Sequence, residues 1–138
     1  MSGIPTVTAS LGNAPYLVHL SDDLGHQWQA DEPVEIGGAN TAPSPDRLLL
    51  GSLGSCTAIT VQMVAARRQI PLTGIQVKLS LNPDGKPEAG TDIVRVIELQ
   101  GELSQEQREQ LLKIANACPV HKILTGEVRI ATSLTEPA

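Results

Sequence analysis

An uncharged run over residues 48–66 constrains the fold of this chain more than any other feature. Arg47 precedes the run, and Arg67 and Arg68 follow it. Its length would suffice for a membrane-spanning helix, but polar side chains and glycines interrupt it at Gly51, Ser52, Gly54, Ser55, Thr57, Thr60 and Gln62. We therefore predict a helix that is apolar all round because protein, rather than lipid, buries it.

Local signals mark both ends of this helix. Ser44 is a predicted N-cap, Pro45 suits the first helical position, and Asp46 faces the positive end of the helix dipole. The pair Ile70-Pro71 predicts that the helix ends at about residue 69, because the residue before a proline avoids the α conformation.

Strands are predicted on both sides of the helix. Before it, short β-type segments suggest a meander over 6–9, 16–20, 27–30 and 34–36, and a Gly- and Pro-rich loop follows over 37–43. After it, strands are predicted over 74–81, 92–100 and 127–134, the first and last from strict alternation of apolar and polar residues.

Two more helices are predicted between the last strands. Ser104 and Gln107 have the spacing of a capping box, and the apolar stripe of the helix they begin runs to Cys118. Pro119 breaks that helix and can begin a short one with Cys118 as its N-cap. The 138 residues therefore predict a single α+β domain over 1–138.

Charge and composition exclude several function classes. The net charge is −5, the first 46 residues contain no Lys or Arg, and Tyr16 and Trp28 are the only aromatic residues. Such a chain offers neither a basic surface nor a stacking platform for nucleic acid. The start of the chain has no basic region followed by an apolar one, so we expect a cytoplasmic protein whose two cysteines are free thiols.

The two cysteines are the candidate reactive groups, and each also has a purely structural reading. Cys56 follows a run of small residues that would let a substrate approach the sulfur, although a free cysteine often fills a core. At a helix N-terminus the Cys118 thiolate would be favoured, and His121, if protonated, would add a positive charge. A disulfide between them cannot be judged from a sequence separation of 62 positions.

Metal and cofactor sites are not predicted. Cys118 and His121 give one pair of ligands, while His19, His26 and Cys56 are scattered singly, and a structural zinc site needs four ligands. No Gly-rich phosphate loop is present, and no strand-turn-helix elbow supports Ser52 or Ser55 as a nucleophile.

Two separated cysteine motifs make the chain similar to a known family. The run 43–57 (PSPDRLLLGSLGSCT), Ile70-Pro71-Leu72 and the run 117–124 (ACPVHKIL) resemble the OsmC-like family of osmotically induced and organic hydroperoxide resistance proteins. Residues 31–33 (DEP) and 37–38 (GG) fit the branch that carries the Cys-Pro-Val-His-Lys motif at its second cysteine.

The resemblance implies an intertwined homodimer in which antiparallel sheets wrap two long central helices. It also implies a cysteine-based peroxidase that reduces organic hydroperoxides in stress defence. Cys56 would be the peroxidatic cysteine and form a sulfenic acid, Cys118 would be the resolving cysteine and form a disulfide, and an external dithiol would reduce that disulfide without any cofactor.

The residues that would support the thiolate depart from the family pattern. Hydroperoxide resistance members pair the first cysteine with an arginine from the N-terminal strands and a glutamate ten positions before the cysteine. Here Asp46 stands at the acidic position, and the first 46 residues contain no arginine. Arg47, or His26 if protonated, is the candidate replacement for the cation.

The function hypotheses therefore differ in class. The first is a peroxidase with an apolar interface pocket, lined from 48–64, that prefers alkyl or lipid-like hydroperoxides to hydrogen peroxide. The alternative is a non-catalytic binding or redox-sensing dimer that holds a small apolar or thiol ligand. A zinc-bound structural dimer is the third.

Overall fold

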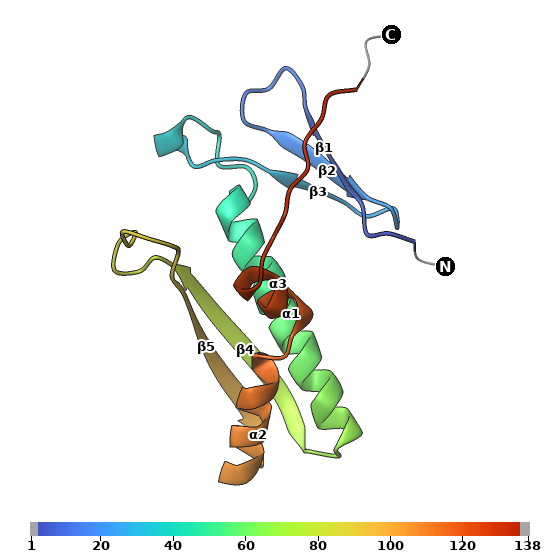
Figure 1. Cartoon of the computed structure of the whole chain (residues 1–138), viewed down its shortest axis with the longest axis vertical. Coiled ribbons are helices and arrows are strands. Elements are labelled where there is room, and N and C mark those ends of the chain that lie inside the picture. Colours follow the sequence, from blue (N-terminus) through green and yellow to red (C-terminus); the bar gives the residue numbers. More distant parts are fainter. Residues whose placement is uncertain (1–2, 136–138) are drawn as a thin grey trace. The chain divides into compact units, whose positions relative to one another are not determined.

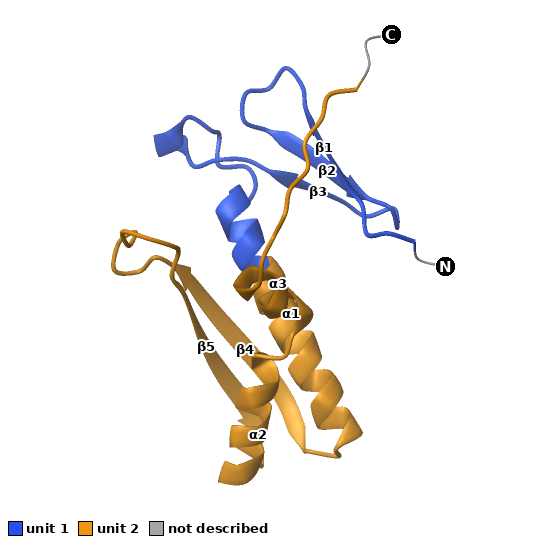
Figure 2. Cartoon of the chain, in the orientation of Figure 1, with its two compact units in different colours: residues 1–51 blue, residues 52–138 orange. Residues whose placement is uncertain are grey.

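Three short strands form the first sheet of the computed structural model, which describes residues 3–135 (Figure 1). Strands β1 (Val7–Leu11), β2 (Val18–Asp22) and β3 (Gln27–Ala30) pair antiparallel in sequence order. This confirms the predicted meander, although β2 begins later than expected because Tyr16 has a φ of 70° and belongs to the preceding turn. The chain divides at residue 51 into two units, which are described separately (Figure 2).

The strand predicted over 34–36 is wrong. These residues form a short 3₁₀ helix, η1 (Val34–Ile36), in which the Ile36 N–H donates to the Pro33 carbonyl at 3.0 Å. Gly37 follows with a φ of 121°, which favours glycine and turns the chain away. The local i→i+3 bonds satisfy the backbone here, whereas a strand would need a partner strand beside it.

Helix α1 (Pro45–Arg67) begins at the predicted proline. Gln69 ends it in the left-handed conformation, with a φ of 56°. The Gln69 N–H then donates to the Ala66 carbonyl, and the Ile70 N–H donates to the Ala65 carbonyl at 2.8 Å. This is a Schellman end, in which glutamine takes the place usually held by glycine.

The chain itself buries only one face of α1, so the prediction of a helix buried on every side is wrong for a single chain. The buried residues form one stripe, Leu53, Gly54, Thr57, Val61 and Ala65, while Ile59 is 57% exposed and Met63 is 45% exposed. Among residues 3–135, α1 is the one helix with the length and mean hydropathy, 1.6, of a membrane span. Length and composition alone are weak evidence for a span, so the exclusion of a membrane stays a prediction.

The second unit packs α1 and a further helix against a long hairpin (Figure 1). Strand β4 (Leu72–Leu81) pairs antiparallel with β5 (Ile93–Gly101). Side chains of α1, the hairpin and helix α2 (Gln105–Ala115) form the core, with Val61, Ala65, Ile70, Leu111 and Ala115 buried at its centre. Gly54 allows α1 to approach the hairpin, because a Cβ there would lie 2.8 Å from Leu79 Cδ1.

Both predicted helix starts near the end of the chain are confirmed. Ser104 and Gln107 form a complete capping box at the start of α2, and Cys118 is the N-cap of helix α3 (Pro119–Thr125), with Pro119 at its first position. Within residues 3–135, two small antiparallel sheets and three α-helices confirm the α+β class.

The strand predicted over 127–134 is wrong for the chain as described. Residues 127–134 are extended without a ladder partner, and Ile130 is 85% exposed. Alternation of apolar and polar residues encodes which side chains share a face, but a strand also needs a second backbone to pair with.

Candidate functional site

The first turn of α3 brings the two cysteines together, although they are far apart in the sequence. The backbone N–H of Val120 donates to Cys56 Sγ at 3.5 Å, and the N–H of His121 donates to Cys118 Sγ at 3.3 Å. Cys56 lies near enough to Cys118 that its side chain helps to lower the pKa of the Cys118 thiol. Both are free thiols, so this is a reduced pair of neighbouring cysteines.

The two sulfurs differ in their access to solvent. The Cys118 side chain has no exposed surface. Cys56 is partly buried and lines an open cavity of about 610 Å³. Six of its other lining residues are apolar (Ile59, Met63, Val64, Ala117, Pro119 and Val120), and four are polar or charged (Ser52, Ser55, Thr60 and Arg67). Only Cys56 of the pair is therefore placed to meet a molecule that enters this cavity, which we call the cysteine cavity.

An arginine that sequence reasoning did not select is hydrogen-bonded to the surroundings of Cys118. Arg95, on β5, donates from Nη1 to Thr57 Oγ1 at 3.0 Å. Its Nη2 donates to Asn116 Oδ1 at 2.7 Å and lies 3.1 Å from His121 Nδ1. Thr57 Oγ1 in turn lies 3.9 Å from Cys118 Sγ, so Arg95 reaches the buried sulfur through one hydroxyl group.

A signal for Arg95 was present in the strand pattern. Along β5 the half-buried residues alternate with exposed ones, and Arg95 lies in the same row as Ile93, Ile97 and Leu99. A charged residue in the row that faces the core needs polar partners to compensate its desolvation. Here Thr57, Asn116 and His121 are those partners.

The pKa of Cys118 is the balance of burial and polar contacts. Burial raises the pKa of this thiol, but the hydrogen bonds from the His121 backbone, Cys56 and Thr57 and the positive charge of Arg95 together lower it below its ordinary value. Cys118 is therefore a buried cysteine whose thiolate form is favoured.

His121 lies where the sequence placed it, but its ring accepts a hydrogen bond. An arginine has only donors, so the Nδ1 atom that faces Arg95 must carry a lone pair. In this arrangement the backbone of His121 supports Cys118 and Arg95 provides the nearby positive charge. Within residues 3–135, no group of three or more His, Cys, Asp or Glu side chains converges to hold a metal.

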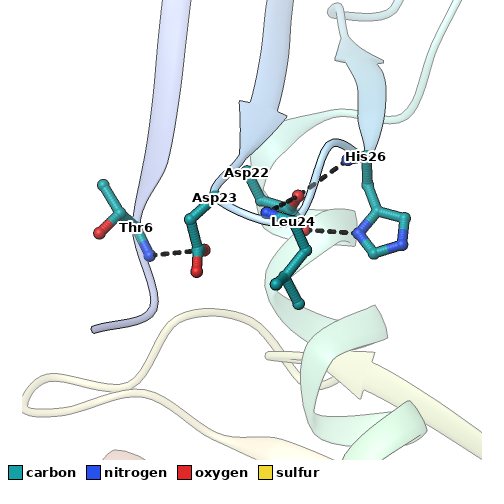
Figure 3. A network of polar contacts seen from close by, with 5 residues as sticks. All are labelled: Thr6, Asp22, Asp23, Leu24 and His26. Atoms are coloured by element: carbon teal, nitrogen blue, oxygen red, sulfur yellow. Dashed lines mark hydrogen bonds and ion pairs between the residues drawn. The ribbon is translucent and has the colours of Figure 1, made fainter. Parts of the chain in front are cut away.

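The other candidate residues lie in the first unit and have partners there. Arg47 Nη1 donates to Ser44 Oγ at 2.8 Å, and Ser44 donates to Asp46 Oδ1, which lowers the pKa of Asp46. His26, in the turn between β2 and β3, lies 2.8 Å from Asp22 Oδ2 through Nδ1 (Figure 3). Asp46, Arg47 and His26 as thiolate partners therefore stay predictions.

Comparisons with known proteins found one matching family model and several similar solved structures. A family model described as "OsmC-like protein" matches residues 37–133. Among solved structures, an OsmC-like protein from Mycoplasma pneumoniae is 20% identical, with a TM-score of 0.75 and coverage of 91% of this chain and 90% of that one. No curated protein matches.

Two further structures carry a functional description. An organic hydroperoxide resistance protein from Legionella pneumophila, also described as a predicted redox protein, is 24% identical, with a TM-score of 0.64 and coverage of 90% of both chains. An organic hydroperoxide resistance protein from Elizabethkingia anophelis is 20% identical, with a TM-score of 0.68 and coverage of 91% of both chains. At these identities the likeness establishes the fold.

Proposed function

The chain belongs to the OsmC-like protein family, and from that premise we propose that it is a thiol peroxidase that reduces organic hydroperoxides with Cys56 and Cys118. One observation carries the proposal: two reduced cysteines are neighbours beside the first turn of α3, and only one of them faces an open cavity. A purely structural pair would have no need of that difference in access.

The first step belongs to Cys56. Its thiolate attacks the outer oxygen of a hydroperoxide ROOH, the O–O bond breaks, and the alkoxide leaves and takes up a proton to become ROH. Cys56 is oxidised to a sulfenic acid in this step. The apolar lining of the cysteine cavity favours hydroperoxides with an alkyl body over hydrogen peroxide.

The second step belongs to Cys118. Its thiolate attacks the sulfur of the sulfenic acid, a disulfide forms, and the hydroxide that leaves takes up a proton to become water. The pKa of Cys118 is lowered although the thiol is buried, so a larger share of it is in the attacking thiolate form than for an ordinary cysteine. An external dithiol then reduces the disulfide by two thiol–disulfide exchanges and is itself oxidised to a disulfide.

Loss of thiols on exposure to a hydroperoxide tests the proposal. Reduced protein is mixed with cumene hydroperoxide, free thiols are counted, and cumyl alcohol is measured. We expect both thiols to disappear for each alcohol formed in the first turnover. Survival of both thiols, together with no alcohol formed under a dithiol, would contradict the proposal and leave a binding or sensing role.

Matched serine variants separate the two cysteines. Cys56→Ser should abolish alcohol formation, because the attacking sulfur is lost. Cys118→Ser should still form one equivalent of alcohol and stop at a sulfenic acid, which a sulfenic-acid-specific reagent such as dimedone traps. If Cys118→Ser were inert and Cys56→Ser were oxidised instead, the roles of the two sulfurs would be reversed.

We also propose that the working form is a homodimer that covers the exposed face of α1. That face carries Ile59 and Met63, 57% and 45% exposed, beside the cysteine cavity. Burial of such side chains against a second copy would stabilise the dimer by the hydrophobic effect.

A further inference from the structure

A second cavity in the same unit lies beside Arg95 and is separate from the cysteine cavity. Its volume is about 400 Å³, and its lining residues are Leu53, Thr91, Ile93, Arg95, His121, Leu124 and Thr125. No residue is shared with the lining of the cysteine cavity. We call this space the arginine cavity, and the peroxidase mechanism makes no use of it.

The polar groups of the arginine cavity suit a negatively charged ligand. No carboxylate within residues 52–135 forms an ion pair with Arg95. Its guanidinium uses three N–H groups for the bonds to Thr57, Asn116 and His121, and arginine has about five. Two threonine hydroxyls line the same space, so the cavity contains donors and a positive charge without a counter-charge.

The rest of the lining narrows the class of anion. Leu53, Ile93 and Leu124 give the cavity an apolar wall, against which an alkyl chain would be buried and a bare inorganic ion would gain nothing. The planar guanidinium matches the geometry of a carboxylate. The volume lies at the small end of the range for ligand pockets.

We propose that the arginine cavity binds the carboxylate of a small acid with an alkyl body. The carboxylate accepts the remaining Arg95 N–H groups, and the chain lies on the three aliphatic side chains. The inference goes beyond the peroxidase proposal, because it needs neither a hydroperoxide nor a disulfide.

Binding of a carboxylate in the arginine cavity would also change the pKa of the buried Cys118. The groups around Cys118 are Cys56 and Thr57 on α1, Arg95 on β5 and His121 on α3. A bound carboxylate would offset the positive charge of Arg95, which is one of the causes of the lowered pKa of Cys118. The pKa of Cys118 should therefore rise when the acid is bound, and the site would act as a regulator of that thiol.

Binding of hexanoate to the reduced full-length chain is the primary test. We expect saturable binding by calorimetry and no binding of the uncharged hexanamide, because the charge is what Arg95 recognises. Inorganic phosphate should bind more weakly than hexanoate. If neither hexanoate nor phosphate bound, or if phosphate bound and hexanoate did not, the proposal would be overturned.

Variants locate the bound acid. Arg95→Gln should weaken hexanoate binding about tenfold or more, because the charge-assisted hydrogen bonds to the carboxylate are lost. Arg108→Gln is the matched control, since it removes the same charge from an exposed position on α2. Equal weakening in both variants would contradict a local site.

A second variant tests the same cavity in case the Arg95→Gln chain does not fold. Thr91→Phe adds a large side chain to the lining of the cavity from an exposed position, and Thr91 is not one of the hydrogen-bond partners of Arg95. It should abolish hexanoate binding. The Cys118 Cβ chemical shift, followed against pH with and without hexanoate, should show a raised pKa in the wild-type chain and no change in Thr91→Phe. An unshifted titration in the saturated wild-type chain would overturn the regulatory part of the proposal.

Discussion

Thr57 has one hydroxyl proton and several neighbours that compete for it. Its oxygen accepts from Arg95 at 3.0 Å, and it donates to the Leu53 carbonyl at 2.7 Å, while Cys118 Sγ lies 3.9 Å away. The side chain is completely buried. When Cys118 is a thiolate, rotation of this hydroxyl towards the sulfur would replace the bond to Leu53, so Thr57 links the charge of Arg95 to the state of the thiol.

Replacement of Thr57 by valine should therefore destabilise the protein and weaken the thiolate. Valine has nearly the same shape but leaves an Arg95 N–H without its acceptor, so we expect a loss of about 1–3 kcal/mol in the free energy of unfolding. The pKa of Cys118 should rise, because one of the hydrogen bonds that lowers it is removed. Denaturant unfolding and the pH titration of the Cys118 Cβ shift measure the two effects.

Thr57→Ser is the control for this prediction. Serine keeps the hydroxyl and loses only a methyl group, so the pKa of Cys118 should stay close to that of the wild-type chain. A serine variant that raised the pKa as much as valine does would show that packing, rather than the hydrogen bond, supports the thiolate.

Asp31 fixes the loop that follows β3, and no sequence motif predicted this role. Its carboxylate is buried and accepts from the Thr41 hydroxyl at 2.7 Å and from the backbone N–H groups of Glu32, Ala39 and Thr41. The Thr41 hydroxyl is the largest cause, and these bonds lower the pKa of Asp31 to about 2. The loop over 31–41 therefore depends on an ionised carboxylate.

The pH dependence of the first unit follows from this shift. A carboxylate whose folded pKa is about 2, against a reference value of 3.8, stabilises the fold above pH 3.8 and loses that contribution as the pH falls towards 2. Trp28 on β3 lies close to the loop in the sequence, so its fluorescence should report the loss. Asp31→Asn should flatten the change between about pH 4 and pH 2. Asp84→Asn, which alters a turn of the other unit, should leave the titration of Trp28 unchanged.

Local chemistry made several residues of the site predictable. Pro119 after Cys118 predicts that Cys118 is an N-cap. In the structure Cys118 has this position, and its Sγ accepts a hydrogen bond from the His121 N–H. Arg95 was missed because its role depends on which row of β5 faces α1, and a charged residue is ordinarily expected in the exposed row. The proximity of Cys56 to Cys118 is tertiary, so only the family resemblance suggested it.

At the scale of elements, the signals that lie within a few residues of one another were the reliable ones. The start of α1 at Pro45, the capping box of α2 and the hairpin strands β4 and β5 each follow from such signals. The segments 34–36 and 127–134 were read as strands from side-chain type alone. Neither has a second backbone to pair with among residues 3–135, and pairing is a property that no single segment encodes.

The capping box of α2 gives a prediction at this scale. The Ser104 hydroxyl accepts from the Gln107 N–H at 3.1 Å, and the Gln107 side chain accepts from the Ser104 N–H at 3.0 Å. Ser104→Ala should lower the free energy of unfolding by about 1 kcal/mol, because an N-terminal N–H loses its partner. Chemical denaturation measures the change, and Ser104→Asp should restore most of the stability since aspartate also caps. A full-sized loss in both variants would argue against the cap.

At the scale of the whole molecule, two apolar features have no cover from any of residues 3–135. Ile59 and Met63 on α1 are about half exposed, and Val128 and Ile130 in the extended C-terminal segment are 56% and 85% exposed. Exposed apolar rows of this kind mark interaction surfaces. A second copy that covered α1 and paired with the C-terminal segment would account for the helix predicted to be buried on all sides and for the strand predicted over 127–134.

A charge on the exposed face of α1 should therefore break the assembly. We expect the wild-type chain to sediment at twice its mass of 14.6 kDa, and Ile59→Glu to raise the dissociation constant of the dimer by about tenfold or more, because a carboxylate without a partner would be buried. Leu112→Glu is the matched control, since Leu112 lies on α2 and is 59% exposed, against 57% for Ile59. Analytical ultracentrifugation over a concentration series measures all three. A monomeric wild-type chain, or equal dissociation in both variants, would contradict the assignment of this face to the dimer.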